Sequence, residues 1–225
     1  MKPNLTRRVF AEFVGTLFLL AVVVGSGVMG DKLSGGNVAI ALLANSLATG
    51  AGLVALLLTF APVSGAHLNP AVTLMELWLR RFTLMETGAY IAAQVSGAIV
   101  GVMVAHVMFV LPLVSLSTHQ RSGGAQLFSE FVATFGLFAV IWGCARHRAS
   151  AVPYAVGAYI TAAYWFTSST SFANPAVSLA RSLTNTFAGI RPVDVAPFVG
   201  AQIAGAFAAT LLFRWLEKEP GHDVT

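Results

Sequence analysis

The chain has 225 residues, of which 56% are hydrophobic and only 10% are charged, and its mean hydropathy is +0.77. Soluble domains carry about 25% charged residues, so this composition excludes an ordinary soluble protein and indicates an integral membrane protein. The net charge of +4 and the pI near 9.6 would suit nucleic-acid binding, but in a membrane protein they reflect Lys and Arg in cytoplasmic loops. We therefore expect a lipid bilayer as partner and no nucleic acid. Cys144 is the only cysteine, so a disulfide framework is excluded, and no ligand set suggests a metal or cofactor.

Six segments are apolar over enough length, or nearly enough, to cross a hydrocarbon core of about 30 Å. They are residues 9–28, 38–60, 86–110, 127–144, 152–167 and 195–212. The runs are continuous rather than alternating, which predicts helices and not the strands of a barrel. The first run imitates a secretory signal, but it contains Glu12 and lacks a convincing cleavage site, so we interpret it as a retained span. The fifth run is the shortest.

The distribution of basic residues predicts the orientation. If the N-terminus is cytoplasmic, nine of the 13 Lys and Arg residues fall on the inner side and four on the outer side. The inner set is Lys2, Arg7, Arg8, Arg80, Arg81, Arg146, Arg148, Arg214 and Lys218, and the outer set is Lys32, Arg121, Arg181 and Arg191. The positive-inside rule then predicts that both termini are cytoplasmic. The compact loops and short tails favour a protein of the plasma (cell inner) membrane.

The tripeptide Asn-Pro-Ala occurs twice, at residues 69–71 and 174–176. Asn is a strong helix N-cap and Pro suits the first helical position, so each copy predicts a helix start. The apolar runs that follow, 70–79 and 175–183, hold about 10 residues and would extend about 15 Å, half of the hydrocarbon core. Two half-helices entering from opposite faces would bring Asn69, Asn174 and two positive helix ends together at the midplane. This arrangement predicts a pore.

Parts of the first half recur in the second. Residues 11–16 (AEFVGT) resemble 129–134 (SEFVAT), and residues 93–98 (AQVSGA) resemble 201–206 (AQIAGA), with one Asn-Pro-Ala between each pair. We therefore expect a single domain, 1–225, built from repeat one at 1–114 and repeat two at 125–218. Each repeat has three spans and a half-helix, and the odd number of spans inserts the second repeat upside down.

These features resemble the aquaporin or major intrinsic protein family. The resemblance rests on the two Asn-Pro-Ala motifs, the Ser-Gly-Ala-His lead-in at 64–67, Glu12 with its repeat Glu130, and two Gln-x-x-Gly segments. It implies an all-α, right-handed bundle of six transmembrane helices and two re-entrant half-helices, one pore per subunit and a homotetramer. It also implies that Asn69 and Asn174 cap the half-helices and offer their NH2 groups to the solute, while the apposed helix ends disfavour cations and interrupt proton relay.

The chain departs from the family directly after the second Asn-Pro-Ala. The family usually has Arg there, at the narrowest outer constriction, whereas this chain has Val177. Without Arg the pore loses a fixed charge, several donors and bulk, which predicts tolerance for larger neutral solutes. Arg181 lies four residues further on a similar helix face, about 6 Å along the axis. It is a candidate for restoring positive charge at the outer mouth.

The other constriction residues follow from offsets to the family motifs. Thr49 takes a position often filled by an aromatic side chain, and Ser171 lies three residues before the second motif. The fifth-span position has two alternatives, because the segment before that motif is shorter than usual: counting forward gives Tyr164, and counting back gives Ala162. We prefer Tyr164, since deletions fall more easily in loops than in spans. With Val177, these side chains predict an uncharged, mildly polar ring.

Four polar side chains have two interpretations each. Glu12 and Glu130 lie inside spans, where a carboxylate is expensive. They suit either a proton relay or, as the resemblance favours, acceptance of hydrogen bonds from the irregular backbone before the half-helices. We interpret His67 as a brace for its loop rather than a pH gate. Asn45 either lines the pore or bonds to a neighbouring helix.

The sequence therefore predicts a passive channel for water and small uncharged solutes such as glycerol, urea and neutral metalloid hydroxides, for example arsenous acid. A strict water channel is the first alternative. An alternating-access transporter, which also uses inverted repeats and broken helices, is the second. We expect no enzyme, because the chain offers no cluster of nucleophile, base and orienting acid.

Overall fold

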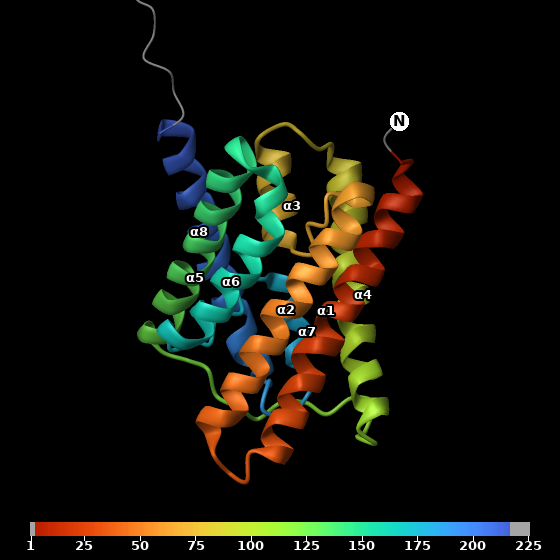
Figure 1. Ribbon diagram of the computed structural model, residues 1–225, viewed down its shortest axis with the longest axis vertical. Helices are drawn as coiled ribbons and strands as arrows, with labels where there is room; N and C mark the ends of the chain where they lie inside the picture. The colour runs from red at the N-terminus through yellow and green to blue at the C-terminus, as the bar shows by residue number, and fades with distance from the viewer. Residues whose placement is uncertain (1–2, 217–225) are drawn as a thin grey trace, which may run out of the picture.

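The computed structural model describes residues 3–216, and this part of the chain is helical and contains no strand. Long helices surround two short ones (Figure 1). The elements in chain order are α1 (Leu5–Leu33), α2 (Val38–Ser64), α3 (Pro70–Trp78), α4 (Leu84–Met108), α5 (Gly124–His147), a single 3₁₀ turn (Ala149–Ala151), α6 (Val152–Phe166), α7 (Pro175–Arg181) and α8 (Pro192–Leu216).

Five of the described helices, α1, α2, α4, α5 and α8, have 24 to 29 residues and are apolar enough to cross a membrane. Helix α6 has only 15 residues, or about 22 Å, and falls short of a core of about 30 Å. The 3₁₀ turn directly precedes it. The six predicted segments are thus helical in the predicted order, and the fifth is the shortest of them.

Several helices begin before their apolar runs, because capping residues lie in the polar flanks. Oδ1 of Asn4 accepts a hydrogen bond from the backbone N–H of Arg7 at 3.0 Å, which starts α1. Asn37 also caps α2, which begins at Val38, the start that its apolar run predicts. Thr83 and Glu86 form a capping box at the start of α4. Asn and Thr favour this position because their side-chain oxygens satisfy N–H groups that have no partner in the helix.

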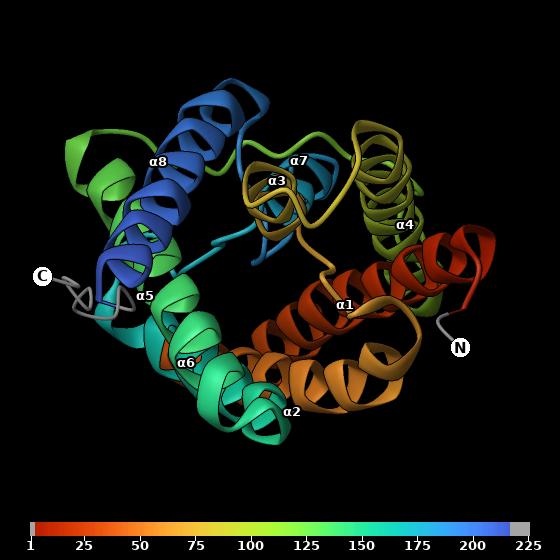
Figure 2. The same ribbon diagram turned by 90° about the horizontal axis from the view of Figure 1, so that it is seen from above.

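The two short helices are the predicted half-helices. Helix α3 has nine residues and α7 has seven, and their N-caps are Asn69 and Asn174. Helix α7 ends at Arg181, two residues before the predicted end. Figure 1 shows α3 in the upper half of the molecule and α7 in the lower half, and Figure 2 shows α7 behind α3 near the centre of the bundle. The half-helices therefore lie end to end, with the long helices around them.

The two halves pack in the same manner. Helix α1 lies against α2 and α4, and α5 lies against α6 and α8. Gly97 on α4 faces the carbonyl oxygen of Phe13, and Gly205 on α8 faces that of Phe131, so closely that a Cβ atom at either glycine would overlap the carbonyl. Phe13 and Phe131 occupy matching positions of the predicted repeats. Helices in membranes approach one another through such small residues.

The described ends of the chain lie on one side of the molecule. Figure 1 places the start of α1, the end of α3, the connection from α5 to α6 and the end of α8 at its upper end. These segments carry the basic residues of the predicted inner side. Two of the predicted inner basic residues, Lys2 and Lys218, lie outside the described residues. So does residue 217, which with Lys218 ends the second predicted repeat.

Candidate functional site: the pore

The N-caps of the two half-helices meet near the centre of the bundle. Oδ1 of Asn69 and Oδ1 of Asn174 each accept a hydrogen bond from the backbone N–H two residues on, at 2.9 and 3.0 Å. Nδ2 of Asn69 donates to the carbonyl oxygen of Ala173 at 2.9 Å, and Nδ2 of Asn174 donates to that of Leu68 at 2.7 Å. An amide nitrogen carries two hydrogens. Each Asn therefore uses one N–H to join the opposite loop and keeps the second for another acceptor.

The loops before the half-helices have an unusual backbone. Ala66 and Leu68 have φ of +47° and +48°, and Ser171 and Ala173 have φ of +50° and +48°. These residues lie three and one positions before each capping Asn. Side chains rarely adopt this left-handed region, so such a segment persists only where its surroundings hold it in place.

Glu12 holds the first of these loops. Its carboxylate is fully buried, and Oε1 accepts from Oγ of Ser64 at 2.6 Å and from the backbone N–H of His67 at 2.9 Å. Oε2 accepts from the backbone N–H of Leu68 at 2.7 Å and from Nε2 of Gln94 at 2.8 Å. The four bonds tie α1 to the end of α2, to the loop and to α4.

Glu130 holds the second loop with a matching set of donors. Oε1 accepts from Oγ of Ser169 at 2.6 Å and from the N–H of Phe172 at 2.9 Å. Oε2 accepts from the N–H of Ala173 at 2.9 Å and from Nε2 of Gln202 at 2.6 Å. Because both carboxylates are occupied by donors of the loops that they face, the geometry favours the loop-anchoring interpretation over a proton relay.

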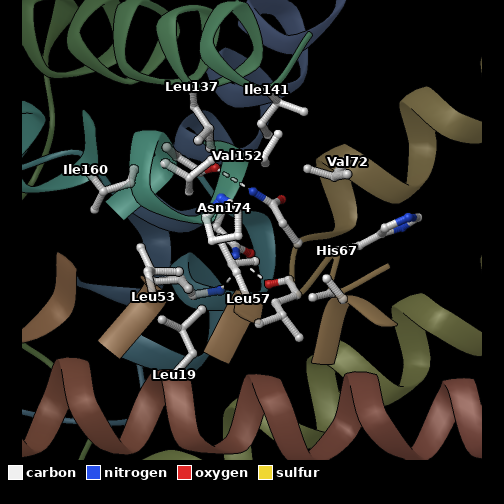
Figure 3. A pocket seen from close by; sticks show the side chains of 18 of the residues that line it. Leu19, Leu53, Leu57, His67, Val72, Leu137, Ile141, Val152, Ile160 and Asn174 are labelled. Atoms are coloured by element: carbon white, nitrogen blue, oxygen red, sulfur yellow. Dashed lines mark hydrogen bonds between the residues drawn. The ribbon is translucent and has the colours of Figure 1, made fainter. Parts of the chain in front are cut away.

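His67 is part of the first loop, and its ring packs against neighbouring side chains. Its Nδ1 lies 3.0 Å from Oγ1 of Thr73, and its ring centroid lies 5.0 Å from that of Phe82 and 5.3 Å from that of Tyr90. Figure 3 shows the ring directed away from Asn174. These contacts favour the bracing interpretation over the pH gate.

A cavity of about 380 Å³ passes beside the two Asn side chains and is lined by both loops and by α1, α2, α3, α5, α6 and α7. Most of its wall is aliphatic. Figure 3 shows side chains that converge around Asn174 from five helices: Leu19, Leu53, Leu57, Val72, Leu137, Ile141, Val152 and Ile160. Such a wall offers no hydrogen bonds, so a polar solute finds partners only at the Asn pair, at the loop backbones and at the ends of the cavity.

The four residues of the predicted constriction all line this cavity, and we call them the outer ring, after the side on which the sequence predicts them: Thr49, Tyr164, Ser171 and Val177. Between 2 and 5% of each is exposed. The Tyr164 hydroxyl donates to Oγ1 of Thr49 at 3.3 Å, and Oγ of Ser171 has no hydrogen-bond partner among the described residues. Ala162, the alternative to Tyr164, is exposed on α6 and is not part of the cavity wall.

Arg181 lies beside the outer ring and lines the same cavity. It is 2% exposed. Its Nε donates to the carbonyl oxygen of Ala188, and its guanidinium carbon lies 3.4 Å from the ring centroid of Phe172. No carboxylate of the described residues forms an ion pair with it. A cationic group on the same short helix as Val177 thus lies in the cavity wall, and its role at the outer mouth stays a prediction.

Known proteins with similar sequences indicate the family to which this chain belongs. The family model described as major intrinsic protein matches residues 1–171, more than half of the chain. The chain belongs to the major intrinsic protein family. Aquaglyceroporin AqpS of Rhizobium meliloti (strain 1021) is 55% identical over 213 residues, which cover 95% of this chain and 91% of that protein. Probable aquaporin NIP4-2 of Arabidopsis thaliana is 32% identical and covers 95% of this chain and 77% of its own.

The fold agrees with this family membership. A crystal structure of the aquaglyceroporin from Plasmodium falciparum superposes with a TM-score of 0.71 and 20% sequence identity, over 95% of this chain and 98% of that one. The half-helices, their Asn caps and the cavity beside them are therefore parts of a major intrinsic protein fold.

Within this family fold, the cavity has a second polar end that the sequence analysis missed. Glu76, Arg81 and Trp142 line it, and we call this end the inner mouth. A signal for Glu76 was present, because Val72 and Glu76 follow Asn69 at helical spacing and so share a face of α3. Nothing local predicted Trp142, since it reaches the site only through the packing of α5.

Asn45 is absent from the cavity wall. Its Nδ2 donates to the carbonyl oxygen of Val23 and to Oγ of Ser26, both at 2.9 Å. Of its two sequence interpretations, the structure supports the bond to a neighbouring helix.

Proposed function

We propose that this protein is a passive channel for water and small uncharged solutes, and that its outer constriction is wide enough for glycerol, urea or neutral metalloid hydroxides such as arsenous acid. The observation that carries the proposal is the cavity itself. One continuous space runs from the outer ring, past Asn69 and Asn174, to the inner mouth. Passage through a preformed space needs no alternating rearrangement of the protein.

The outer ring supports a solute range beyond water. Its four side chains are small or neutral, and Val177 takes the position where the family usually has Arg. A neutral ring imposes little electrostatic selection, and its hydroxyl groups replace part of a solute's hydration. The relative from Rhizobium meliloti carries the name aquaglyceroporin, which agrees with this range.

The geometry at the centre of the pore supports the proposal that cations and protons are excluded there. Two helix N-termini with partial positive charge face each other there, and the free N–H groups of Asn69 and Asn174 are donors only. A water molecule that accepts from them is oriented in a way that breaks a proton-conducting chain.

We further propose that the protein is a homotetramer in the plasma (cell inner) membrane, with both termini in the cytoplasm. Exposed apolar side chains on the long helices, such as Phe18, Leu47 and Phe128, suit contact with lipid or with a neighbouring subunit. The segments at the upper end of Figure 1 carry the basic residues of the predicted inner side, which supports a cytoplasmic location of that end.

The alternatives predict different transport behaviour. A strict water channel would exclude glycerol and urea. A transporter would use Glu12 or Glu130 as a proton site. Each of these carboxylates already accepts four hydrogen bonds from loop and helix donors, which disfavours that use.

Stopped-flow light scattering on proteoliposomes tests the proposal with water, glycerol, urea and arsenous acid. We expect flux linear in the solute gradient for water and at least one larger solute, with a low activation energy. Uptake that saturates or follows a proton gradient would contradict a passive channel, and passage of water alone would select the strict water channel.

A further inference from the structure

Among the described residues that line the cavity, Glu76 at the inner mouth is the only one with a carboxylate. Glu76 lies on α3, and its side chain is 14% exposed, whereas the side chain of Arg81 is 59% exposed. Nη1 of Arg81 lies 3.1 Å from Oε1 of Glu76. Both residues line the cavity, so this ion pair lies where a solute passes between the aliphatic segment and water.

The end of α3 places these two side chains next to each other. Arg80 has φ of +58°, its N–H donates to the carbonyl of Leu77, and the N–H of Arg81 donates to that of Glu76, both at 2.9 Å. This is the hydrogen-bond pattern of a Schellman motif, with Arg80 at the left-handed position. The motif turns the chain back over its last helical turn. The backbone therefore places Arg81 beside Glu76, and the exposed side chain of Arg81 keeps its freedom to move.

Arg81 also reaches the opposite wall of the mouth. Its guanidinium carbon lies 5.5 Å from the ring centroid of Trp142 on α5. The indole is fixed in turn, because its Nε1 donates to Oγ1 of Thr210 on α8 at 3.0 Å. Arg81 thus lies between a carboxylate on α3 and an aromatic ring on α5, and both partners line the cavity.

The two repeats place opposite charges at the two ends of the cavity. Glu76 lies seven residues after Asn69, and Arg181 lies seven residues after Asn174. Both line the cavity, so the inverted repeat carries matching positions to opposite ends. At the outer end Arg181 binds a backbone carbonyl and an aromatic ring, while at the inner end Arg81 neutralises Glu76. An unpaired Glu76 would place a negative charge in the mouth, which favours cations.

We propose that Glu76 and Arg81 form a second selectivity site at the inner mouth. Glu76 provides acceptor oxygens to a solute that leaves the aliphatic segment. Arg81, held between Glu76 and Trp142, narrows the opening and cancels the charge of the carboxylate. This proposal rests on the proposed channel function. An ion pair with so exposed an arginine is weak and screened by salt, so the side chain can move aside when a solute passes.

The test compares Arg81→Gln, Glu76→Gln and the double variant in proteoliposomes. Arg80→Asn is the matched control, because it removes a positive charge one residue away at a position that does not line the cavity, and Asn tolerates a left-handed backbone. The readouts are the fluxes of water, glycerol and erythritol and the leak of K⁺. Size-exclusion chromatography in detergent establishes that each variant is folded.

We expect Arg81→Gln to raise the ratio of erythritol to water flux about threefold, the rate change that corresponds to loss of one exposed ion pair, and to produce a K⁺ leak. The double variant should keep the raised ratio and lose the leak, because the carboxylate is then gone. Arg81→Lys should exclude K⁺ as the wild type does and still pass erythritol faster, since it keeps the charge but not the flat group over Trp142. Arg80→Asn should match the wild type.

The proposal is overturned if Arg81→Gln and the double variant both show the flux ratio and the K⁺ exclusion of Arg80→Asn. The K⁺ leak does not depend on whether larger solutes pass. A wild-type channel that conducts water alone would therefore contradict the proposed solute range and still leave the inner mouth testable by the leak. A wild-type protein that conducts nothing would overturn both proposals.

Discussion

Asn174 and Leu68 lie 106 residues apart in the chain, yet Nδ2 of Asn174 donates a hydrogen bond of 2.7 Å to the carbonyl oxygen of Leu68. Leu68 exposes that carbonyl because its backbone is left-handed, and Glu12 holds its N–H in place. The reciprocal bond joins Asn69 to Ala173. The two half-helices are therefore joined by the side chains of their capping residues beside the cavity, and we test this joint and the cavity wall with four variants.

Asn174→Asp keeps the oxygen that caps α7 but removes the donor to Leu68. A carboxylate then faces a carbonyl in a buried site, and an unsatisfied buried group costs about 1–3 kcal/mol. We expect a lower thermal unfolding midpoint in detergent and a measurable K⁺ leak through the negatively charged centre. Asn174→Ala is the comparison, since it loses both cap and donor without adding charge. An unchanged midpoint in both variants would show that the joint contributes nothing to stability.

Glu130→Gln tests whether the buried carboxylate is an anchor or a proton site. A glutamine has one acceptor oxygen and an NH2 group, so it cannot accept from the N–H groups of both Phe172 and Ala173 without misplacing a donor. We expect a large loss of folded protein, while the fraction that folds conducts passively. The measurement pairs membrane yield with flux per folded channel. Full yield together with abolished transport would support a transporter instead.

Val177→Arg tests the outer ring. The new side chain adds bulk and five donors beside Tyr164 and Thr49. We expect glycerol and urea flux to fall by about tenfold or more while water flux falls much less, because a narrower charged ring excludes larger solutes first. Val177→Leu controls for bulk without charge. Equal inhibition of every solute, or none, would count against Val177 as the selective position.

Arg181→Met tests the cation beside the ring. Methionine keeps much of the length of the side chain but loses the charge, the bond to Ala188 and the stacking on Phe172. We expect altered flux of neutral solutes together with weaker exclusion of K⁺, measured in the same vesicles. Lys32→Met removes an exposed positive charge of the predicted outer side that does not line the cavity and serves as control. Neutral-solute flux identical to wild type would remove Arg181 from the selectivity of the outer mouth.

The sequence by itself determined much of this protein. Two Asn-Pro-Ala motifs started two half-helices because Asn caps and Pro fits the first turn, and both effects are local. Continuous apolar runs predicted the long helices, and the repeat of Glu12 at Glu130 predicted matching anchors. Val177 was visible as a departure from its family without any structure. Local signals did not predict how far some helices extend beyond their apolar runs. Helix α1, for example, begins at Leu5 because Asn4 caps it, although its apolar run begins at residue 9.

Only the tertiary structure decided which side chains share the cavity. Tyr164 lies in its wall and Ala162 does not, because the packing of α6 against α2 fixes the rotation of α6. The end of α3 places Arg81 beside Glu76 locally, but Trp142 comes from α5, and no spacing in the chain relates it to either of them. Periodicity fixes which residues share a face of one helix. Which face looks into the pore depends on contacts between segments far apart in sequence, and those contacts exist only once the bundle has packed.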